Sequence, residues 1–304
     1  MESIIKTINL SKEYRLKERH KKILALNNVN IEILRGEKFG LLGPNGAGKT
    51  TFISILTTLI QPTNGYAIIN GYNILKNPNK VKRFIGLMSG SDMIYYRITG
   101  YHNLKFFAKI YEVPNYKQKI DEIAQMLELT KWMNEYVERY STGMKTKLSV
   151  ARMLLINPEI FFLDEPTLGL DVTTTNFIIE KLQELDKTMI LCSHNMSIVE
   201  KLCDRIAFIN HGKIIKMGKK RDLQYIFQKG VQIFIEIDDR RQQLLDILSQ
   251  SDFIFECVED KSGLVVTLKE RNDYSRLFSI LQNYPITKIE EKSLSIENLF
   301  LKLI

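Results

Sequence analysis

Short apolar runs alternate with helix-like segments along most of the chain. Residues 38–43, 159–166 and 188–194 are short and mostly apolar, whereas residues 50–60 and 171–185 have the length and spacing of helices. A short, continuous apolar run is typical of a strand buried on both faces, as in a parallel sheet. The alternation, which continues to about residue 222, predicts a mainly parallel α/β sheet with ligand chemistry at the carboxyl ends of its strands.

The C-terminal part of the chain follows a different pattern. In residues 231–237 every second residue is valine or isoleucine, which fits a half-buried strand. The segments that follow give the order strand, helix, strand, strand, helix, strand, which is the order of a ferredoxin-like domain. We therefore expect two domains: a larger one at residues 1–225 and a small accessory α+β domain at residues 226–304.

Residues 140–155 have the pattern of a helix with a polar start. Ser141 is a good N-cap, and apolar residues recur at helical spacing from Met144 to Leu155. Lys145 and Lys147 lie in the first two turns, where the positive end of the helix dipole makes cations unfavourable. The pattern fits an anion site at the helix N-terminus, and it also fits an ordinary capped helix with solvated lysines.

Composition and charge narrow the class of protein only slightly. A net charge of +8 over 304 residues permits a nucleic acid, an anionic membrane surface or a phosphate ligand. Three cysteines without metal-ligand spacing fit free thiols in a reducing cytosol. Residues 50–75 carry no charge, but a polar stretch interrupts them, so we expect no membrane span.

A phosphate-binding pattern lies between the first predicted strand and helix. The sequence GPNGAGKTT matches G-x-x-x-x-G-K-[ST] in the required context. Its glycines let backbone N–H groups surround a phosphate, the lysine reaches the β- and γ-phosphates, and the threonine hydroxyl can ligate Mg²⁺. The candidate nucleotide-binding residues are Gly43, Asn45, Gly46, Ala47, Gly48, Lys49, Thr50 and Thr51.

Acidic and histidine side chains end two other predicted strands. Asp164 follows the apolar run IFFL and can reach a phosphate-bound Mg²⁺, which makes it, with Thr50, a candidate metal ligand. Glu165 comes next and is placed to polarise a water. His194 ends the strand TMILCS, where its imidazole can donate to a γ-phosphate. Glu165 and His194 are therefore the candidate catalytic residues.

The order GPNGAGKTT, YSTGM, FFLDEP, LGLD and SH resembles the nucleotide-binding subunit of an ATP-binding cassette transporter. The resemblance covers residues 1 to about 222. It implies a P-loop cassette with a helical subdomain at about residues 88–158, and the hydrolysis of ATP with Mg²⁺. It also implies that Tyr14 stacks on adenine.

YSTGM corresponds to the signature motif of that family. Ser141 and Gly143 match its serine and second glycine, whereas Thr142 and Met144 depart from it. The resemblance implies that this helix N-terminus binds the γ-phosphate of an ATP held by a second cassette subunit, in a homodimer or heterodimer. It also implies that Asp171 links the two sites across that interface.

One position departs from the family in a way that concerns the metal. A glutamine usually follows the strand that reads FIGLMS here, but Gly90 or Ser91 occupies that place. No glutamine occurs between Gln61 and Gln118.

The function that we expect is an ATPase subunit that powers a separate integral membrane permease. The resemblance is strongest to export-type cassettes, which implies export of a drug, peptide, lipid or ion from a peripheral position at the cytoplasmic face of the cell membrane. No nucleic-acid partner is expected. The alternatives are a soluble cassette ATPase with a non-membrane partner and a regulatory cassette that binds ATP without hydrolysis.

Overall fold

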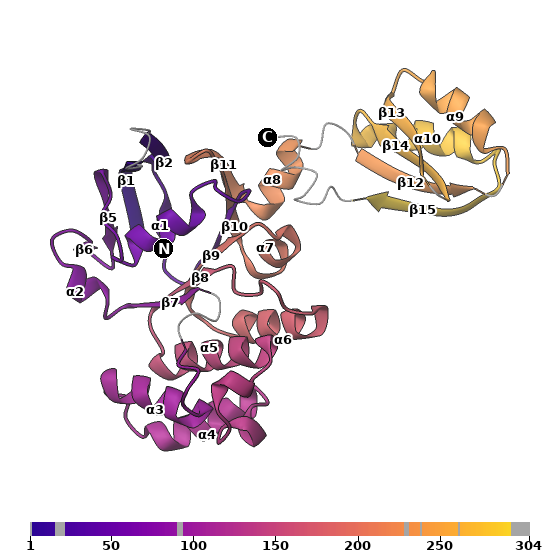
Figure 1. Ribbon diagram of the computed structural model, residues 1–304. Helices are drawn as coiled ribbons and strands as arrows, with labels where there is room; N and C mark the ends of the chain where they lie inside the picture. The colour runs from indigo at the N-terminus through magenta and orange to yellow at the C-terminus, as the bar shows by residue number, and fades with distance from the viewer. Residues whose placement is uncertain are drawn as a thin grey trace. The chain divides into compact units, whose positions relative to one another are not determined.

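The computed structural model describes residues 2–15, 22–89, 94–227, 231–237, 239–260 and 262–292. The chain divides into two compact units, Met1–Lys220 and Arg221–Ile304, each with its own hydrophobic core (Figure 1). The division falls a few residues before the boundary at residue 225 that the sequence pattern suggests.

The larger unit is built around a six-stranded sheet in the order β11-β10-β4-β9-β8-β7. Its strands are β4 (Lys38–Leu42), β7 (Ile85–Ser89), β8 (Ile160–Asp164), β9 (Thr188–Ser193), β10 (Arg205–Asn210) and β11 (Lys213–Lys219). All neighbours pair in parallel except β10 and β11. Strands β8 and β9 are buried along their whole length, so the prediction of a mainly parallel sheet is confirmed.

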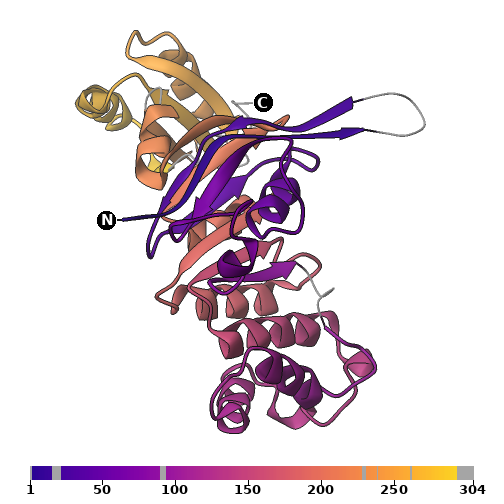
Figure 2. The same ribbon diagram turned by 90° about the vertical axis from the view of Figure 1, so that its left-hand side faces the viewer.

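A second, antiparallel sheet packs in the same unit, and the apolar pattern does not predict it. Its order is β2-β1-β5-β6, and β3 pairs with β1. The strands are β1 (Ser3–Arg15), β2 (Lys22–Val29), β3 (Glu32–Leu34), β5 (Asn64–Ile69) and β6 (Tyr72–Asn73). Figure 2 shows β1 and β2 as a long hairpin that extends beyond the rest of the unit.

Four helices follow strands of these sheets. They are α1 (Lys49–Leu56), α2 (Pro78–Val81), α6 (Val172–Gln183) and α7 (Met196–Leu202). Helix α1 buries Phe52, Ile53 and Leu56 in a core shared by both sheets. This burial fixes the start of α1 at the carboxyl end of β4, where the phosphate-binding pattern lies.

Three helices form a separate group between β7 and β8. They are α3 (Gly100–Ile110), α4 (Tyr116–Met126) and α5 (Thr142–Ile156), with short 3₁₀ turns at Thr130–Trp132 and Val137–Arg139. The helices pack on one another, and Figure 1 shows them together at one end of the larger unit. Ser141 caps α5, because its hydroxyl accepts the Met144 N–H at 3.2 Å.

The smaller unit has the predicted βαββαβ order. Along the chain, α8 (Lys220–Phe227) spans the division between the two units. The elements of the βαββαβ order are β12 (Val231–Ile237), α9 (Arg241–Ser249), β13 (Ile254–Asp260), β14 (Gly263–Leu268), α10 (Tyr274–Leu281), preceded by a 3₁₀ turn (Arg271–Asp273), and β15 (Ile286–Lys292). The sheet order β13-β14-β12-β15 is that of a ferredoxin-like domain, and the alternating valine and isoleucines of β12 are buried. Residues 293–304 lie outside the described residues.

Within the described part of the chain, no helix combines the length and the apolar character that crossing a bilayer requires.

Candidate nucleotide-binding site

The carboxyl ends of three neighbouring strands bring most of the predicted site residues together. Strand β9 lies between β4 and β8, with Leu42 paired to Ser193 and Asp164 paired to Cys192. The loop at residues 43–48 follows β4, Glu165 follows β8, and His194 follows β9. The predicted loop, acids and histidine therefore meet at one edge of the sheet, as expected for parallel strands.

Glycines in the loop have identifiable structural reasons. A Cβ at Gly43 would lie 2.3 Å from the carbonyl oxygen of Ile209, and one at Gly48 would lie 2.4 Å from that of Ala25. Gly48 also has a φ of 109°, which only glycine adopts readily, and it is the N-cap residue of α1. Gly46 has a φ of 81° and open space around it, and Asn45 beside it is exposed. The loop thus packs against Ile209 and Ala25 on one side and is open to a ligand on the other.

Lys49 folds back on its own loop. Its side chain is only 6% exposed, and its ammonium donates to the carbonyl oxygens of Gly43 at 2.7 Å and Pro44 at 3.2 Å. The same ammonium lies 3.7 Å from a carboxylate oxygen of Glu165. A phosphate in the loop would offer Lys49 a stronger, doubly charged partner at the same place.

Glu165 is held by the strand end that lies beside it. Its Oε1 accepts the backbone N–H of His194 at 3.0 Å and contacts the ring Nδ1 of His194 at 2.8 Å, and its Oε2 accepts the hydroxyl of Ser193 at 3.0 Å. The backbone of Glu165 has a φ of 48°, in the left-handed region. Sequence reasoning missed Ser193, although a hydroxyl directly before a candidate catalytic histidine is a usable signal.

Asp164 is a buried carboxylate with an unused oxygen. Its Oδ1 has no hydrogen-bond partner among the described residues. Burial raises the pKa of Asp164, while a hydrogen bond with the Thr50 side chain lowers it by a smaller amount. An unpaired buried oxygen beside a threonine hydroxyl is the environment that a divalent cation with oxygen ligands would satisfy. Thr50 and Asp164 therefore fit the predicted metal.

The signature residues lie at a different place from the loop in this chain. Gly143 packs against α6, where a Cβ would lie 3.2 Å from the methyl group of Thr174. Asp171 caps α6 by accepting the N–H of Thr174 at 2.9 Å and its hydroxyl at 2.7 Å, and these bonds lower the pKa of Asp171. Among the described residues, no hydrogen bond or ion pair joins Ser141 or Gly143 to the loop at residues 43–51.

An exposed apolar surface adjoins the candidate catalytic residues. A hollow of about 330 Å³ lies beside Glu165 and His194, between α6 and α7. Two apolar side chains at its rim, Leu168 and Val172, are 65% and 77% exposed. Large apolar side chains with this exposure favour contact with another molecule.

Tyr14 lies near the end of β1, in the antiparallel sheet. It pairs with Ile23 across the hairpin, and the residue is 39% exposed. The ammonium of Lys12 lies 5.3 Å from the ring centroid. The ring is therefore accessible to a planar ligand.

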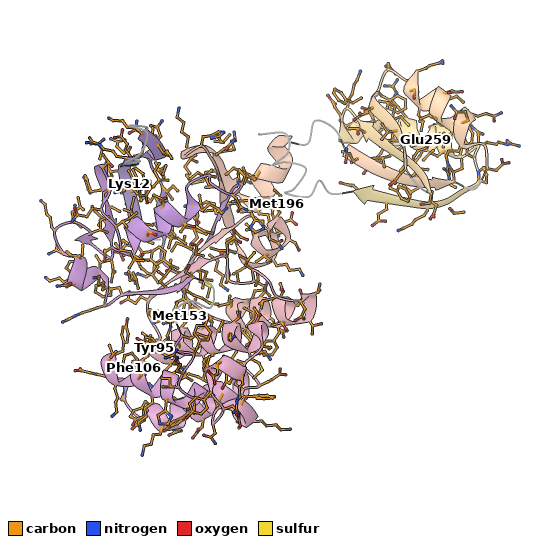
Figure 3. The ribbon with its side chains drawn as sticks, in the orientation of Figure 1. Lys12, Tyr95, Phe106, Met153, Met196 and Glu259 are labelled. Carbon is orange, nitrogen blue, oxygen red and sulfur yellow. The ribbon has the colours of Figure 1, made fainter. Side chains whose placement is uncertain are left out.

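A second hollow lies where the segment before α3 meets that helix, and we call it the aromatic groove. It has a volume of about 480 Å³ and is lined by Ile94, Tyr95, Tyr96, Arg97, Ile98 and Phe106. The rings of Tyr95 and Phe106 meet edge to face with centroids 5.1 Å apart, and Figure 3 shows these two side chains close together. Gly90 and Ser91, at the place of the missing glutamine, lie outside the described residues.

Comparison with known proteins places these features in one family. A family model described as ABC transporter matches residues 26–168. The ABC transporter ATP-binding protein NatA of Bacillus subtilis is 35% identical over 228 residues, which cover 70% of this chain and 93% of that protein. The bacitracin transport ATP-binding protein BcrA of Bacillus licheniformis is 32% identical over 100% of this chain and 98% of its own length.

Solved structures agree with the sequence relatives. A dimeric ATP-binding cassette in a post-hydrolysis state, bound to ADP and phosphate, is 27% identical. It superposes with a TM-score of 0.65 over 71% of this chain and 98% of its own. A structure of the ATP-binding subunit of an ABC transporter is 25% identical, with a TM-score of 0.66, and the match covers 74% of this chain and 93% of that one.

Proposed function

The chain belongs to the family of ABC transporter ATP-binding subunits, and from this premise we propose how its own residues bind ATP, hydrolyse it and transmit the result. It is an ATPase subunit that powers a membrane permease. The observation that carries the proposal is the meeting of Lys49, Glu165 and His194 at the carboxyl ends of β4, β8 and β9.

ATP binds with its phosphates in the loop at residues 43–51. The loop is open at Asn45 and Gly46. A Cβ at Gly46 would have no atom of the described chain within 4 Å. Lys49 exchanges its carbonyl partners and Glu165 for the β- and γ-phosphates, because phosphate oxygens carry more charge. Tyr14 stacks on the adenine ring. Lys12, close to that ring, adds a cation near the nucleotide.

Thr50 and Asp164 would hold Mg²⁺, Thr50 with its hydroxyl and Asp164 with the carboxylate whose Oδ1 has no partner among the described residues. Bound Mg²⁺ supplies positive charge against the charge that develops on the phosphates. Asp164 suits this role because it is buried at the end of β8.

Glu165 acts as the general base once Lys49 has moved to the phosphates. The attacking water gives a proton to Glu165 while its oxygen forms a bond to the γ-phosphorus. The bond from that phosphorus to the β–γ bridging oxygen breaks, which leaves ADP and phosphate. His194 orients Glu165 through its backbone N–H and ring Nδ1. No hydrogen bond within the described part of the chain engages its Nε2, the nitrogen that would meet a γ-phosphate oxygen.

A second cassette subunit completes each site. The chain carries one phosphate loop and one signature motif, and no hydrogen bond or ion pair among the described residues joins the two. In a head-to-tail dimer, Ser141 and Gly143 of one subunit meet the γ-phosphate held by the other, at a helix N-terminus that favours anions. Asp171 and the exposed Leu168 and Val172 lie at the interface.

The permease docks in the aromatic groove. A groove lined by aromatic and branched side chains, with Arg97 at its wall, suits an amphipathic helix with an acidic residue. The subunit then works peripherally at the cytoplasmic face of the membrane. BcrA, named for bacitracin transport, matches the whole chain, and another relative is named for linearmycin resistance, whereas relatives named for methionine import match 72% of the chain. This difference in coverage supports export.

The experiment that tests this function combines hydrolysis with localisation. The isolated chain should release phosphate from ATP, and Lys49→Ala should abolish nucleotide binding. The chain should sediment with membranes only when a membrane protein encoded beside it is co-expressed. Sedimentation without that protein, or none with it, would contradict the transporter role.

A further inference from the structure

Ser193 lies at the last position of β9 with its side chain only 1% exposed. Its hydroxyl makes two hydrogen bonds: it contacts Oε2 of Glu165 at 3.0 Å and accepts the backbone N–H of Asn195 at 3.0 Å. A hydroxyl has a single proton, and a carboxylate only accepts. The hydroxyl proton of Ser193 therefore points at Glu165.

Asn195 fixes the other side of that hydroxyl. It is the N-cap of α7, and its side chain accepts the N–H of Ile198 at 3.4 Å. The N–H of Asn195 is thus held by the start of a helix and cannot follow a rotation of the serine. The orientation of Ser193 is set by backbone geometry on one side and by Glu165 on the other.

The two oxygens of Glu165 have different surroundings as a result. Oε2 is tied to the buried Ser193 hydroxyl, whereas Oε1 meets His194 and lies 3.7 Å from the Lys49 ammonium. Oε1 is therefore the oxygen on the side of the phosphate loop. The terminal torsion angle of a glutamate side chain has a broad distribution, so the side chain alone would not keep Oε1, rather than Oε2, on the side of the loop.

We propose that Ser193 is a positioning residue that anchors Oε2 of Glu165 and thereby presents Oε1 to the attacking water. This inference rests on the proposed role of Glu165 as general base. When phosphates draw Lys49 away, Oε1 loses the nearby cation and faces the place of the attacking water. Oε2 stays bound to Ser193, so the carboxylate does not rotate out of line. Ser193 touches neither the nucleotide nor the water and acts through Glu165 alone.

The test uses three serine variants of the full chain. Ser193→Ala removes the hydroxyl, and Ser193→Thr retains one. Ser149→Ala is the matched control, because Ser149 is also fully buried and its hydroxyl has no hydrogen-bond partner within the described residues. Thermal unfolding of each variant with and without ATP, together with displacement of a fluorescent ATP analogue, checks the fold and nucleotide binding separately from turnover.

Ser193→Ala should lower kcat about tenfold, the usual worth of a hydrogen bond to a charged group, with KM and analogue displacement unchanged. Ser193→Thr should recover most of the lost kcat, and Ser149→Ala should match the wild type. Added to Glu165→Gln, Ser193→Ala should cause no further loss, since its effect passes through Glu165.

The outcomes distinguish the positioning role of Ser193 from the proposed role of Glu165 as general base. If Glu165→Gln is slow but Ser193→Ala keeps the wild-type kcat, the positioning role is wrong and the general base stands. If Ser193→Ala slows the Glu165→Gln protein by the same factor as the wild type, Ser193 acts elsewhere and the inference fails. If Glu165→Gln hydrolyses ATP normally, the role of Glu165 fails and the inference fails with it.

Discussion

His194 contacts one oxygen of Glu165 twice, through its backbone N–H at 3.0 Å and its ring Nδ1 at 2.8 Å. Because a carboxylate only accepts, Nδ1 carries the ring proton in this contact. The remaining nitrogen, Nε2, then donates to a phosphate oxygen only when the ring carries its second proton. The contact between His194 and Glu165 therefore links the position of the ring protons of His194 to the proposed base.

The division of each site between two subunits gives a complementation prediction. Ser141→Arg blocks the surface that meets the partner's γ-phosphate, and Lys49→Ala blocks the phosphate loop. Each variant alone should be inactive as a homodimer. In a mixed dimer one site carries both changes and the other carries neither, so equal mixing should restore a fraction of the wild-type ATPase rate. Absence of recovery at every mixing ratio would contradict a signature that acts on another chain.

The buried, unpaired oxygen of Asp164 gives a metal prediction. Asp164→Asn should reduce Mg²⁺-dependent hydrolysis by about 100-fold or more, because a neutral amide is a poorer ligand and supplies no charge. It should also weaken Mn²⁺ binding in the presence of ADP, measured by electron paramagnetic resonance. Asp186→Asn, at an exposed position, is the control. Unchanged Mn²⁺ affinity in Asp164→Asn would remove Asp164 from the metal site.

The aromatic groove depends on a buried amide. Asn103 is 1% exposed, accepts the N–H of Tyr95 at 2.7 Å, and donates to the carbonyl oxygens of Tyr95 at 2.9 Å and Thr99 at 3.1 Å. These bonds shape the loop that lines the groove. Asn103→Ala should therefore alter the groove without touching the phosphate loop.

We expect Asn103→Ala to leave basal ATPase within about twofold of the wild type and to cut stimulation by the co-expressed permease about fivefold, as the loss of one or two buried hydrogen bonds predicts. Phe106→Ala should reduce stimulation in the same way, since it removes a wall of the groove. Asn134→Ala, at an exposed asparagine of the same helical group, should do neither. Full stimulation in both groove variants would place the permease contact elsewhere.

The parallel sheet and the chemistry at its edge could be predicted because both are local. Strands β8 and β9 are continuous apolar runs, and Asp164 and His194 follow them directly. The loop at residues 43–51 has a spacing that few other functions require. The alternation in β12 likewise predicted the face that the smaller unit buries.

The rest depends on contacts between distant residues. The antiparallel sheet escaped prediction because β1 has no regular period; register shifts interrupt its pairing with both β2 and β5. Ser193 lies 28 positions from Glu165 in the sequence. The two residues meet because β8 pairs with β9 and because Glu165, directly after β8, has a left-handed backbone conformation. In the sequence, Asn103 looks like an ordinary polar residue of a helix. Its role depends on hydrogen bonds to Tyr95, in the segment before that helix, which only the fold brings into contact.

The most direct test of the proposed mechanism is the rate of single-turnover ATP hydrolysis by Glu165→Gln, together with the oligomeric state of this variant in ATP. The glutamine keeps the size of the side chain but cannot take a proton from water. The variant should bind ATP with wild-type affinity, hydrolyse it about 10²- to 10⁴-fold more slowly, and accumulate as an ATP-bound dimer in size-exclusion chromatography. Hydrolysis at a near-normal rate, or slow hydrolysis without a dimer, would contradict the assignment of Glu165 as the base of a site shared by two subunits.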